Sequence, residues 1–126
     1  MISPKFYTKD DYKVLQSWWD ARKIDHIPER YLSTMGIMVE NVACGFVYTT
    51  DSAMAIIENF VSNPETPKDI RNKALDLIIE CMLDYCLATG IESIVAFSEL
   101  PVIVERAKKF SFVVPEGSYK MMTRRV

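Results

Sequence analysis

The stretch from Ala53 to Phe97 constrains the fold more than any other part of the chain. It reads as an apolar strand, a proline-bounded loop with basic residues, a long helix, a glycine stop and a second apolar strand. Such a βαβ unit brings the N-terminus of the helix beside the end of the first strand. Free backbone N–H groups at that place attract anions. We therefore expect a ligand of this chain to bind there and to carry phosphate.

The bulk composition indicates one globular domain, which we assign to residues 1–126. Hydrophobic residues make up 49% and charged residues 25%, which is enough apolar material for a core that needs no disulfide bond or metal ion to hold it. The net charge of −2 gives no basic field of the kind that binds nucleic acid. No apolar run approaches a membrane span, and the first residues contain no apolar signal core. We expect a cytoplasmic protein that binds neither nucleic acid nor membrane.

The three cysteines are an odd number, and their spacings fit no metal site. Cys81 and Cys86 are five positions apart on the long helix, so they do not share a face. We interpret both, together with Cys44, as reduced and mostly buried thiols. The sequence thus predicts no bound metal.

The first half of the chain predicts a short strand, two helices and an antiparallel meander. Thr8 and Asp11 resemble a capping box at the start of the first helix, and Pro28 opens the second. The third meander strand is apolar except at Glu58 and Asn59, which indicates a central strand buried on both faces. The expected elements are a strand over 5–8, a helix over 10–23, a short helix from 28 through 32 that ends before Gly36, and strands over 36–40, 42–49 and 53–61.

The second half contains the clearest helix, over residues 69–89. Asn72, Asp76, Glu80 and Asp84 are spaced by four and indicate its solvent face. Gly90 is suited to end it. The remaining elements are expected as a strand over 93–97, a helix from 101, and a final hairpin of strands 112–114 and 118–123.

The resulting order, β-α-α-β-β-β-α-β-α-β-β, resembles the GNAT superfamily of N-acetyltransferases over nearly the whole chain. The resemblance implies an α+β fold with a mixed, mostly antiparallel sheet flanked by helices. It implies acetyl-CoA as co-substrate, held where the strands over 53–61 and 93–97 splay apart. Small, divergent members of this kind are similar to proteins encoded by bacteriophages, and dimers are common among proteins resembling this one.

The family motifs are only partly present. The usual phosphate loop resembles Arg/Gln-x-x-Gly-x-Gly/Ala, whereas this chain has Lys68-Asp69-Ile70-Arg71-Asn72-Lys73-Ala74, with no glycine. The resemblance still assigns the pyrophosphate to Lys68, Arg71, Asn72 and Lys73, and carbonyl polarisation to backbone N–H groups near Phe60, Val61 and Ser62. Ala107 stands where the family carries the tyrosine that protonates the departing thiolate, and Ser111-Phe112 replaces Gly-Phe.

Glu58 is the candidate catalytic residue, because the family often places a general base in this strand. As an acid among apolar residues it would have a raised pKa and deprotonate an amine directly or through water. An ion pair with Lys or Arg, or exposure to solvent, explains it equally well.

Other candidates have ordinary explanations. Trp18 and Trp19 diverge by about 100° on their helix, so one is expected in the core and the other at a groove or rim. His26 and Cys44 fit a surface loop and the core better than a base and a nucleophile. Ser98 and Glu99 fit helix capping as well as function, and Tyr119 could supply the missing acid from the last hairpin.

The resemblance favours an acetyl-CoA-dependent N-acyltransferase that transfers an acetyl group to an unknown amine. The alternative is a catalytically inactive protein of the same fold, structural or viral, that binds a macromolecular partner. A CoA-binding regulator that transfers nothing is a third reading.

Overall fold

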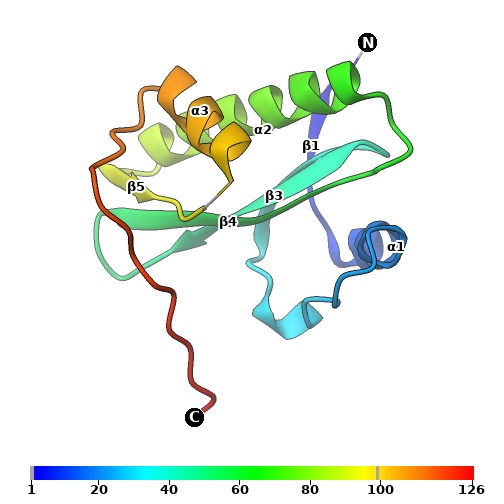
Figure 1. Ribbon diagram of the computed structural model, residues 1–126, viewed down its shortest axis with the longest axis horizontal. Helices are drawn as coiled ribbons and strands as arrows, with labels where there is room; N and C mark the ends of the chain where they lie inside the picture. Colours follow the sequence, from blue (N-terminus) through cyan, green and yellow to red (C-terminus); the bar gives the residue numbers. More distant parts are fainter. Residues whose placement is uncertain (1, 99) are drawn as a thin grey trace.

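The computed structural model describes residues 2–98 and 100–126. Its elements follow the predicted order as far as α3 (Pro101–Lys109), except that a 3₁₀ turn stands in place of the second predicted helix (Figure 1). They are β1 (Pro4–Phe6), the 3₁₀ turn η1 (Lys9–Asp11), α1 (Tyr12–Ala21), the 3₁₀ turn η2 (Glu29–Tyr31), β2 (Met35–Val39), β3 (Ala43–Thr49), β4 (Met54–Ser62), α2 (Lys68–Ala88), β5 (Ser93–Val95) and α3 (Pro101–Lys109). The α+β class is confirmed.

The strands form one mixed sheet in the order β1-β2-β3-β4-β5. The first four strands are antiparallel neighbours, as the short connections between them predict. β5 pairs with β4 in parallel, because α2 carries the chain back across the sheet between them. Figure 1 shows α2 and α3 on one face of the sheet and α1 on the other.

The α1 segment covers its face with a compact aromatic core. The Asp11 carboxylate accepts the Thr8 backbone N–H at 2.8 Å, which confirms the predicted capping box. Leu15, Trp18 and Trp19 are all buried. The expectation of a groove position for one tryptophan is therefore wrong: both fill the core. The second predicted helix is also wrong, since only the short turn η2 forms there.

The long helix α2 covers the opposite face with the predicted apolar residues. Its buried positions are Ala74, Ile78, Ile79, Met82 and Cys86. The predicted solvent face is correct only in its second half, because α3 packs over the first half. There Asn72 Oδ1 and Asp76 Oδ1 accept hydrogen bonds from Arg106 at 2.9 and 2.5 Å.

Strand β4 is central but is not buried on both faces. Ala55 and Ile57 are buried towards α2, whereas Ile56 and Glu58, on the other face, are only partly buried. The prediction fails because α1 covers only the end of β4 that carries Val61, which packs with Trp18 and Trp19.

The predicted final hairpin does not form. Neither 112–114 nor 118–123 is a strand, and the chain runs away from the sheet after α3 (Figure 1). Only Phe112 packs against the core, while Val113, Tyr119 and Met122 are strongly exposed. Within the described residues, β4 is thus the one strand paired with β5.

None of the helices in the described part of the chain combines the length and apolar character that crossing a membrane requires.

Candidate functional site

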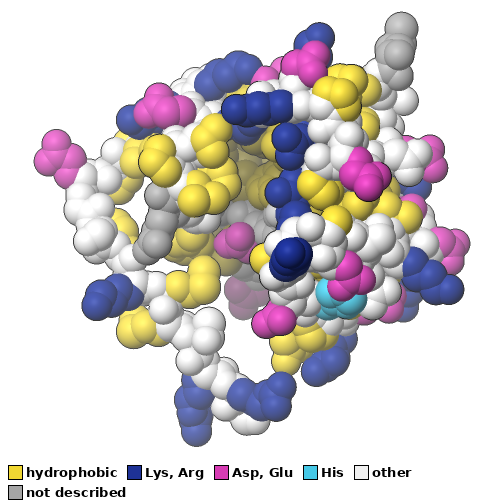
Figure 2. All heavy atoms as spheres, turned by 45° about the vertical axis from the view of Figure 1, so that its right-hand side comes forward, with side chains coloured by type: hydrophobic (Ala, Val, Ile, Leu, Met, Phe, Trp, Pro, Cys, Tyr) yellow, Lys and Arg dark blue, Asp and Glu magenta, His cyan; other side chains and the backbone are white. Residues whose placement is uncertain are grey.

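Strands β4 and β5 run together for three residue pairs and then part. Their parallel pairing extends from Met54 opposite Ser93 to Ile56 opposite Val95. β5 ends there, whereas β4 continues to Ser62. Beyond Ile56, the edge of β4 on the β5 side therefore faces no strand in the described part of the chain. The free backbone groups on that edge can bind a ligand. Figure 2 shows a hollow on this side of the molecule, with hydrophobic walls, acidic side chains inside and Lys and Arg side chains along one rim.

A β-bulge lies in the part of β4 that extends beyond β5 and is paired with β3. Cys44 pairs with Val61 but Phe46 pairs with Glu58, so β4 holds one extra residue. Asn59 has φ of 60°, the left-handed conformation that asparagine tolerates better than most residues. Bulges re-aim the side chains beside them and are frequent next to active sites. The bulge therefore explains why an otherwise apolar strand carries the polar pair at 58 and 59.

Glu58 lies on the sheet face opposite α2, beside this bulge. Its Oε1 accepts the backbone N–H of Asn59 at 3.2 Å. Among the described residues, no Lys, Arg or His nitrogen lies within 4.0 Å of its carboxylate. The expected alternative of an ion pair is thus not observed.

The other three β4 residues predicted to contact the cofactor divide between the two faces. The Phe60 ring covers Gly45 on the α2 side, and the residue is 36% exposed. Val61 is buried in the core on the α1 side. Ser62 ends the strand, where both its hydroxyl and its carbonyl accept hydrogen bonds from Arg22.

The loop from β4 to α2 is held in place by the β2–β3 turn. Asn63 Nδ2 and Thr66 Oγ1 donate to the Asn41 carbonyl at 3.0 and 3.2 Å. Asn63 Oδ1 also accepts the Glu65 N–H at 3.0 Å. Pro67 precedes the helix and provides no side-chain cap. The first N–H groups of a 21-residue helix are therefore left without a capping side chain at a fixed loop.

The four residues predicted to hold phosphate do not form one cluster. Lys68 and Lys73 are exposed, and Arg71 is partly buried, with its Nε atom buried and unpartnered. Asn72 faces α3 instead, because its side chain and its carbonyl accept bonds from Arg106. The structure thus brings Lys68 and Arg71 to the start of α2 and engages Asn72 elsewhere.

Arg22 is a site residue that sequence reasoning missed. It follows α1 directly, and its Nε and Nη2 donate to the Ser62 carbonyl and hydroxyl at 3.0 and 2.8 Å. Burial, and then the positive charge of Arg71, lower the pKa of its guanidinium. An arginine at a helix C-terminus is common, since it complements the helix dipole, so the sequence offers no signal for this contact.

Two residues expected to be ordinary lie outside the site. His26 is bonded to Asp20, with 2.6 Å between Nε2 and Oδ1. Cys44 is buried, and burial raises the pKa of its thiol to about 12, which removes it as a nucleophile.

The three candidates near the C-terminus have no demonstrated place in the site. Ser98 Oγ accepts the Leu100 N–H at 3.1 Å, in the turn before α3. Glu99 lies outside the described residues. Tyr119 is exposed in the terminal segment rather than in a hairpin beside β4, so its suggested role as an acid has no geometric support.

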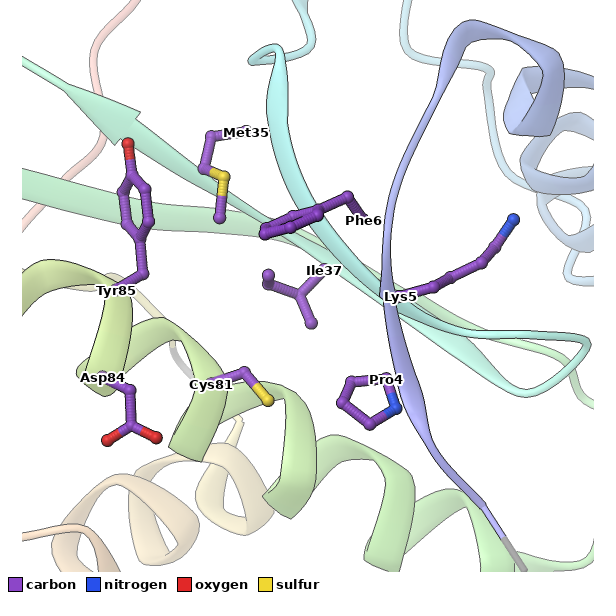
Figure 3. A pocket seen from close by; sticks show the side chains of 8 residues that line it. All are labelled: Pro4, Lys5, Phe6, Met35, Ile37, Cys81, Asp84 and Tyr85. Atoms are coloured by element: carbon purple, nitrogen blue, oxygen red, sulfur yellow. The ribbon is translucent and has the colours of Figure 1, made fainter. Parts of the chain in front are cut away.

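A separate cavity of about 470 Å³ lies far along the sheet from β4 and β5. Figure 3 shows Phe6 and Ile37, from β1 and β2, facing Cys81 and Tyr85 of α2. It contains none of the residues predicted to bind the cofactor. The place where β4 and β5 diverge is therefore separate from this cavity, because β5 and β1 lie at opposite edges of the sheet.

Solved structures with the same architecture decide the fold. A Trypanosoma brucei acetyltransferase matches with a TM-score of 0.68 and 11% identity, covering 98% of this chain and 100% of that one. The chain has the fold of the GNAT acetyltransferases. Another GNAT structure, the aminoglycoside N-acetyltransferase AAC(6')-Iy in complex with CoA, matches with a TM-score of 0.64, 10% identity, and coverage of 98% and 100%.

The GNAT-like architecture is also found in a protein described as a regulator. A transcriptional regulator from Bacillus halodurans C-125 matches with a TM-score of 0.66 and 12% identity, covering 98% of this chain and 100% of that one. Searches with family models and against curated proteins gave no match. The comparisons thus show the fold, and the activity must be argued from the site.

Proposed function

We propose that this chain is an acetyl-CoA-dependent N-acyltransferase in which an amine attacks the thioester directly within a ternary complex. The observation that carries the proposal is the divergence of β4 from β5 beside the bulge at Asn59, which frees the β4 backbone for a ligand. The GNAT fold supports it, since one enzyme of that fold was solved with CoA.

The start of α2 suits the phosphates of the cofactor. Arg71 carries a buried Nε without a partner, and the N-terminus of α2 has no side-chain cap. Lys68 and Lys73 add positive charge where the helix dipole alone would disfavour it, an arrangement that a bound anion would stabilise. Acetyl-CoA would supply the thioester, and these residues would hold its diphosphate.

Glu58 is the group best placed to receive the proton of the amine. As the amine nitrogen bonds to the acyl carbon, the carbon–sulfur bond breaks, and the nitrogen loses a proton to Glu58 directly or through water. Backbone N–H groups of the segment 60–62 would polarise the carbonyl. Since Ala107 stands where a tyrosine is expected, the departing thiolate takes its proton from solvent.

The cofactor proposal is tested first by calorimetric titration with acetyl-CoA and with CoA. Micromolar binding of both is the expected result, because the cofactor contacts lie mainly at the shared diphosphate. An absence of heat and of any thermal shift at millimolar acetyl-CoA would refute the proposal.

The role of Glu58 is tested by Glu58→Gln, with amines of several classes as acceptors. We expect turnover to fall by roughly a hundredfold, the typical contribution of a general base, while acetyl-CoA affinity is unchanged. Glu80→Gln, an exposed change on α2, is the matched control. Equal turnover of the Glu58 variant and the wild type would remove Glu58 from the mechanism.

A second candidate function is a protein of this fold that binds a partner without catalysis. It is favoured by Ala107 and by the glycine-free loop. Titration also separates the two readings, since a ligand that binds only the native state raises the thermal midpoint. Binding of acetyl-CoA without transfer to any amine would favour a CoA-binding regulator.

A further inference from the structure

The terminal segment, residues 112–126, carries large apolar side chains that the rest of the molecule leaves exposed. Val113, Tyr119, Met121 and Met122 are each between 73% and 90% exposed. The segment ends in Tyr-Lys-Met-Met-Thr-Arg-Arg-Val, and Tyr, Met and Arg are the residues enriched where proteins meet. Exposed apolar residues gathered in this way mark a surface that another molecule covers.

The terminal segment also differs in charge from the body of the protein. It has three basic side chains and one acidic one, whereas residues 1–111 have 12 basic and 16 acidic side chains. A basic segment is attracted to an acidic body, in its own copy or in a second one. Figure 1 shows the segment leading away from the sheet of its own copy and not across it towards β1. A second copy is therefore the better placed partner.

Strand β1 offers an open edge for such a partner. It is the first strand of the sheet, and among the described residues no strand pairs with its outer side. The Tyr7 N–H donates to the Gly36 carbonyl at 2.9 Å. Because bonding directions alternate along an antiparallel strand, the N–H and carbonyl of Phe6 point away from β2. An extended segment of another chain can pair with backbone groups exposed in this way.

The cavity of about 470 Å³ lies beside this edge and suits apolar side chains next to a basic one. Phe6 and Tyr85 line it, and its lining includes one carboxylate, Asp84 (Figure 3). Among the described residues, no Lys, Arg or His nitrogen lies within 4.0 Å of Asp84. Lys5 points away from the cavity and pairs with Asp11 at 2.8 Å. A cavity of this volume holds a small ligand whole and so has room for two large side chains.

We propose that the cavity beside β1 holds residues 118–125 of a second copy of this chain, and that the exchange is reciprocal and closes a dimer. In an extended segment Tyr119 and Met121 lie on the same face, so both can enter the cavity. The backbone of the segment then pairs with the free edge at Phe6, and Arg124 reaches Asp84. Closed two-fold dimers are the commonest protein assemblies. The inference does not depend on acetyl transfer.

A disulfide cross-link tests which residues meet. Cys81 lines the cavity, and Met121→Cys puts a second thiol on the face of the segment that enters it. Mild oxidation of the full-length variant should give a covalent dimer on a non-reducing gel, with Cys81 in the bridge by peptide mass spectrometry. Adding Cys81→Ser should abolish that bridge. Val113→Cys, a matched change at another exposed position of the segment, should not bridge to Cys81. A bridge to Cys81 within one copy, or none, would overturn the proposal.

Sedimentation equilibrium tests the association without a cross-link. The wild type should dimerise at micromolar concentration, and Met121→Asp and Asp84→Lys should each weaken the dimer roughly tenfold or more. Asp51→Lys, which reverses an exposed charge between β3 and β4, is the control and should dimerise like the wild type.

Mixing the two weakened variants separates a segment-to-cavity contact from any other interface. A pair of one Met121→Asp copy and one Asp84→Lys copy keeps one intact segment facing one intact cavity. The mixture should therefore associate more strongly than either variant alone. A wild type that stays monomeric, equal association of all the variants, or a monomer whose cavity holds a co-purified small molecule would overturn the proposal.

Discussion

The side-chain amide of Asn59 donates a hydrogen bond to the hydroxyl of Tyr48, with 2.5 Å between Nδ2 and Oη. Tyr48 in turn donates to the Tyr31 carbonyl at 3.2 Å. The bulge in β4 is thus connected through β3 to the turn η2, which lies before the meander. Because Glu58 bonds the backbone N–H of the same asparagine, this chain of contacts fixes the position of the proposed base.

Tyr48→Phe should loosen the bulge without removing any group that bonds to substrate. Two hydrogen bonds are lost, so we expect about 1–2 kcal/mol less free energy of unfolding. Turnover should fall more than the affinity for acetyl-CoA, because Glu58 is displaced and the start of α2 is not. Urea unfolding and steady-state kinetics measure the two effects. Tyr31→Phe is the control, because it removes a hydroxyl from an exposed residue. An equal effect of that variant would mean that the Tyr48 hydrogen bonds do not hold the bulge in place.

The attachment of α3 to α2 should depend on pH through Asp76. Burial alone would raise the pKa of this carboxyl, but the bonds from Lys109 and Arg106 outweigh it and the pKa is lowered. A lowered pKa in the folded state means that the stabilisation is present above the ordinary carboxyl pKa. It is lost as the pH falls through the folded-state value.

Asp76→Asn should therefore cost about 2 kcal/mol at neutral pH and less at a pH well below the ordinary carboxyl pKa. Chemical denaturation at the two pH values gives the difference. Glu105→Gln breaks only the exposed pair with Lys108, and should change little at either pH. A constant cost of the Asp76 variant across the range would show that its ionisation does not matter.

Cys44 should be unreactive in the native protein. With its pKa raised by burial to about 12, roughly one thiol in ten thousand is ionised at pH 8. In a variant with Cys81→Ser and Cys86→Ser, a thiol reagent should react quickly only after denaturant is added. Rapid reaction of the native variant would mean that the core on the α1 side opens readily, and would restore Cys44 as a candidate nucleophile.

Local patterns were sufficient to predict most of the fold. The 3.6-residue period of α2, the glycine after it and the short turns of the meander are properties of neighbouring residues. The predicted final hairpin does not form because the tendency of Phe, Val and Tyr to adopt strands is realised only against a partner strand. Residues 112–114 and 118–123 have none in the described structure.

The site was predictable only where it follows from one segment. Glu58 and Arg71 stand out as charges within patterned elements, and the sequence placed them correctly in β4 and at the start of α2. Arg22 and Tyr48 could not be found, because their roles come from contacts with Ser62 and Asn59 that depend on strand register. The engagement of Asn72 by Arg106 likewise joins two helices, 34 positions apart.

Gly45 should be required for the position of Phe60. A methyl group at Gly45 would lie 2.5 Å from Phe60 Cε1 and 2.9 Å from Met82 Cε, so the neighbours must move. Because the Phe60 side chain is partly exposed, it is the one expected to turn outwards, into the region proposed for the cofactor. Gly45→Ala should then lose about 1–3 kcal/mol of stability and weaken acetyl-CoA binding.

The energetic coupling between positions 45 and 60 can be measured with a double-mutant cycle. Phe60→Leu shortens the side chain that the methyl group meets, so in that background Gly45→Ala should cost clearly less. Thermal unfolding and calorimetric titration of the four proteins give the coupling for stability and for ligand binding separately. Additive effects would mean that Met82, under α2, and not Phe60, gives way to the new methyl group.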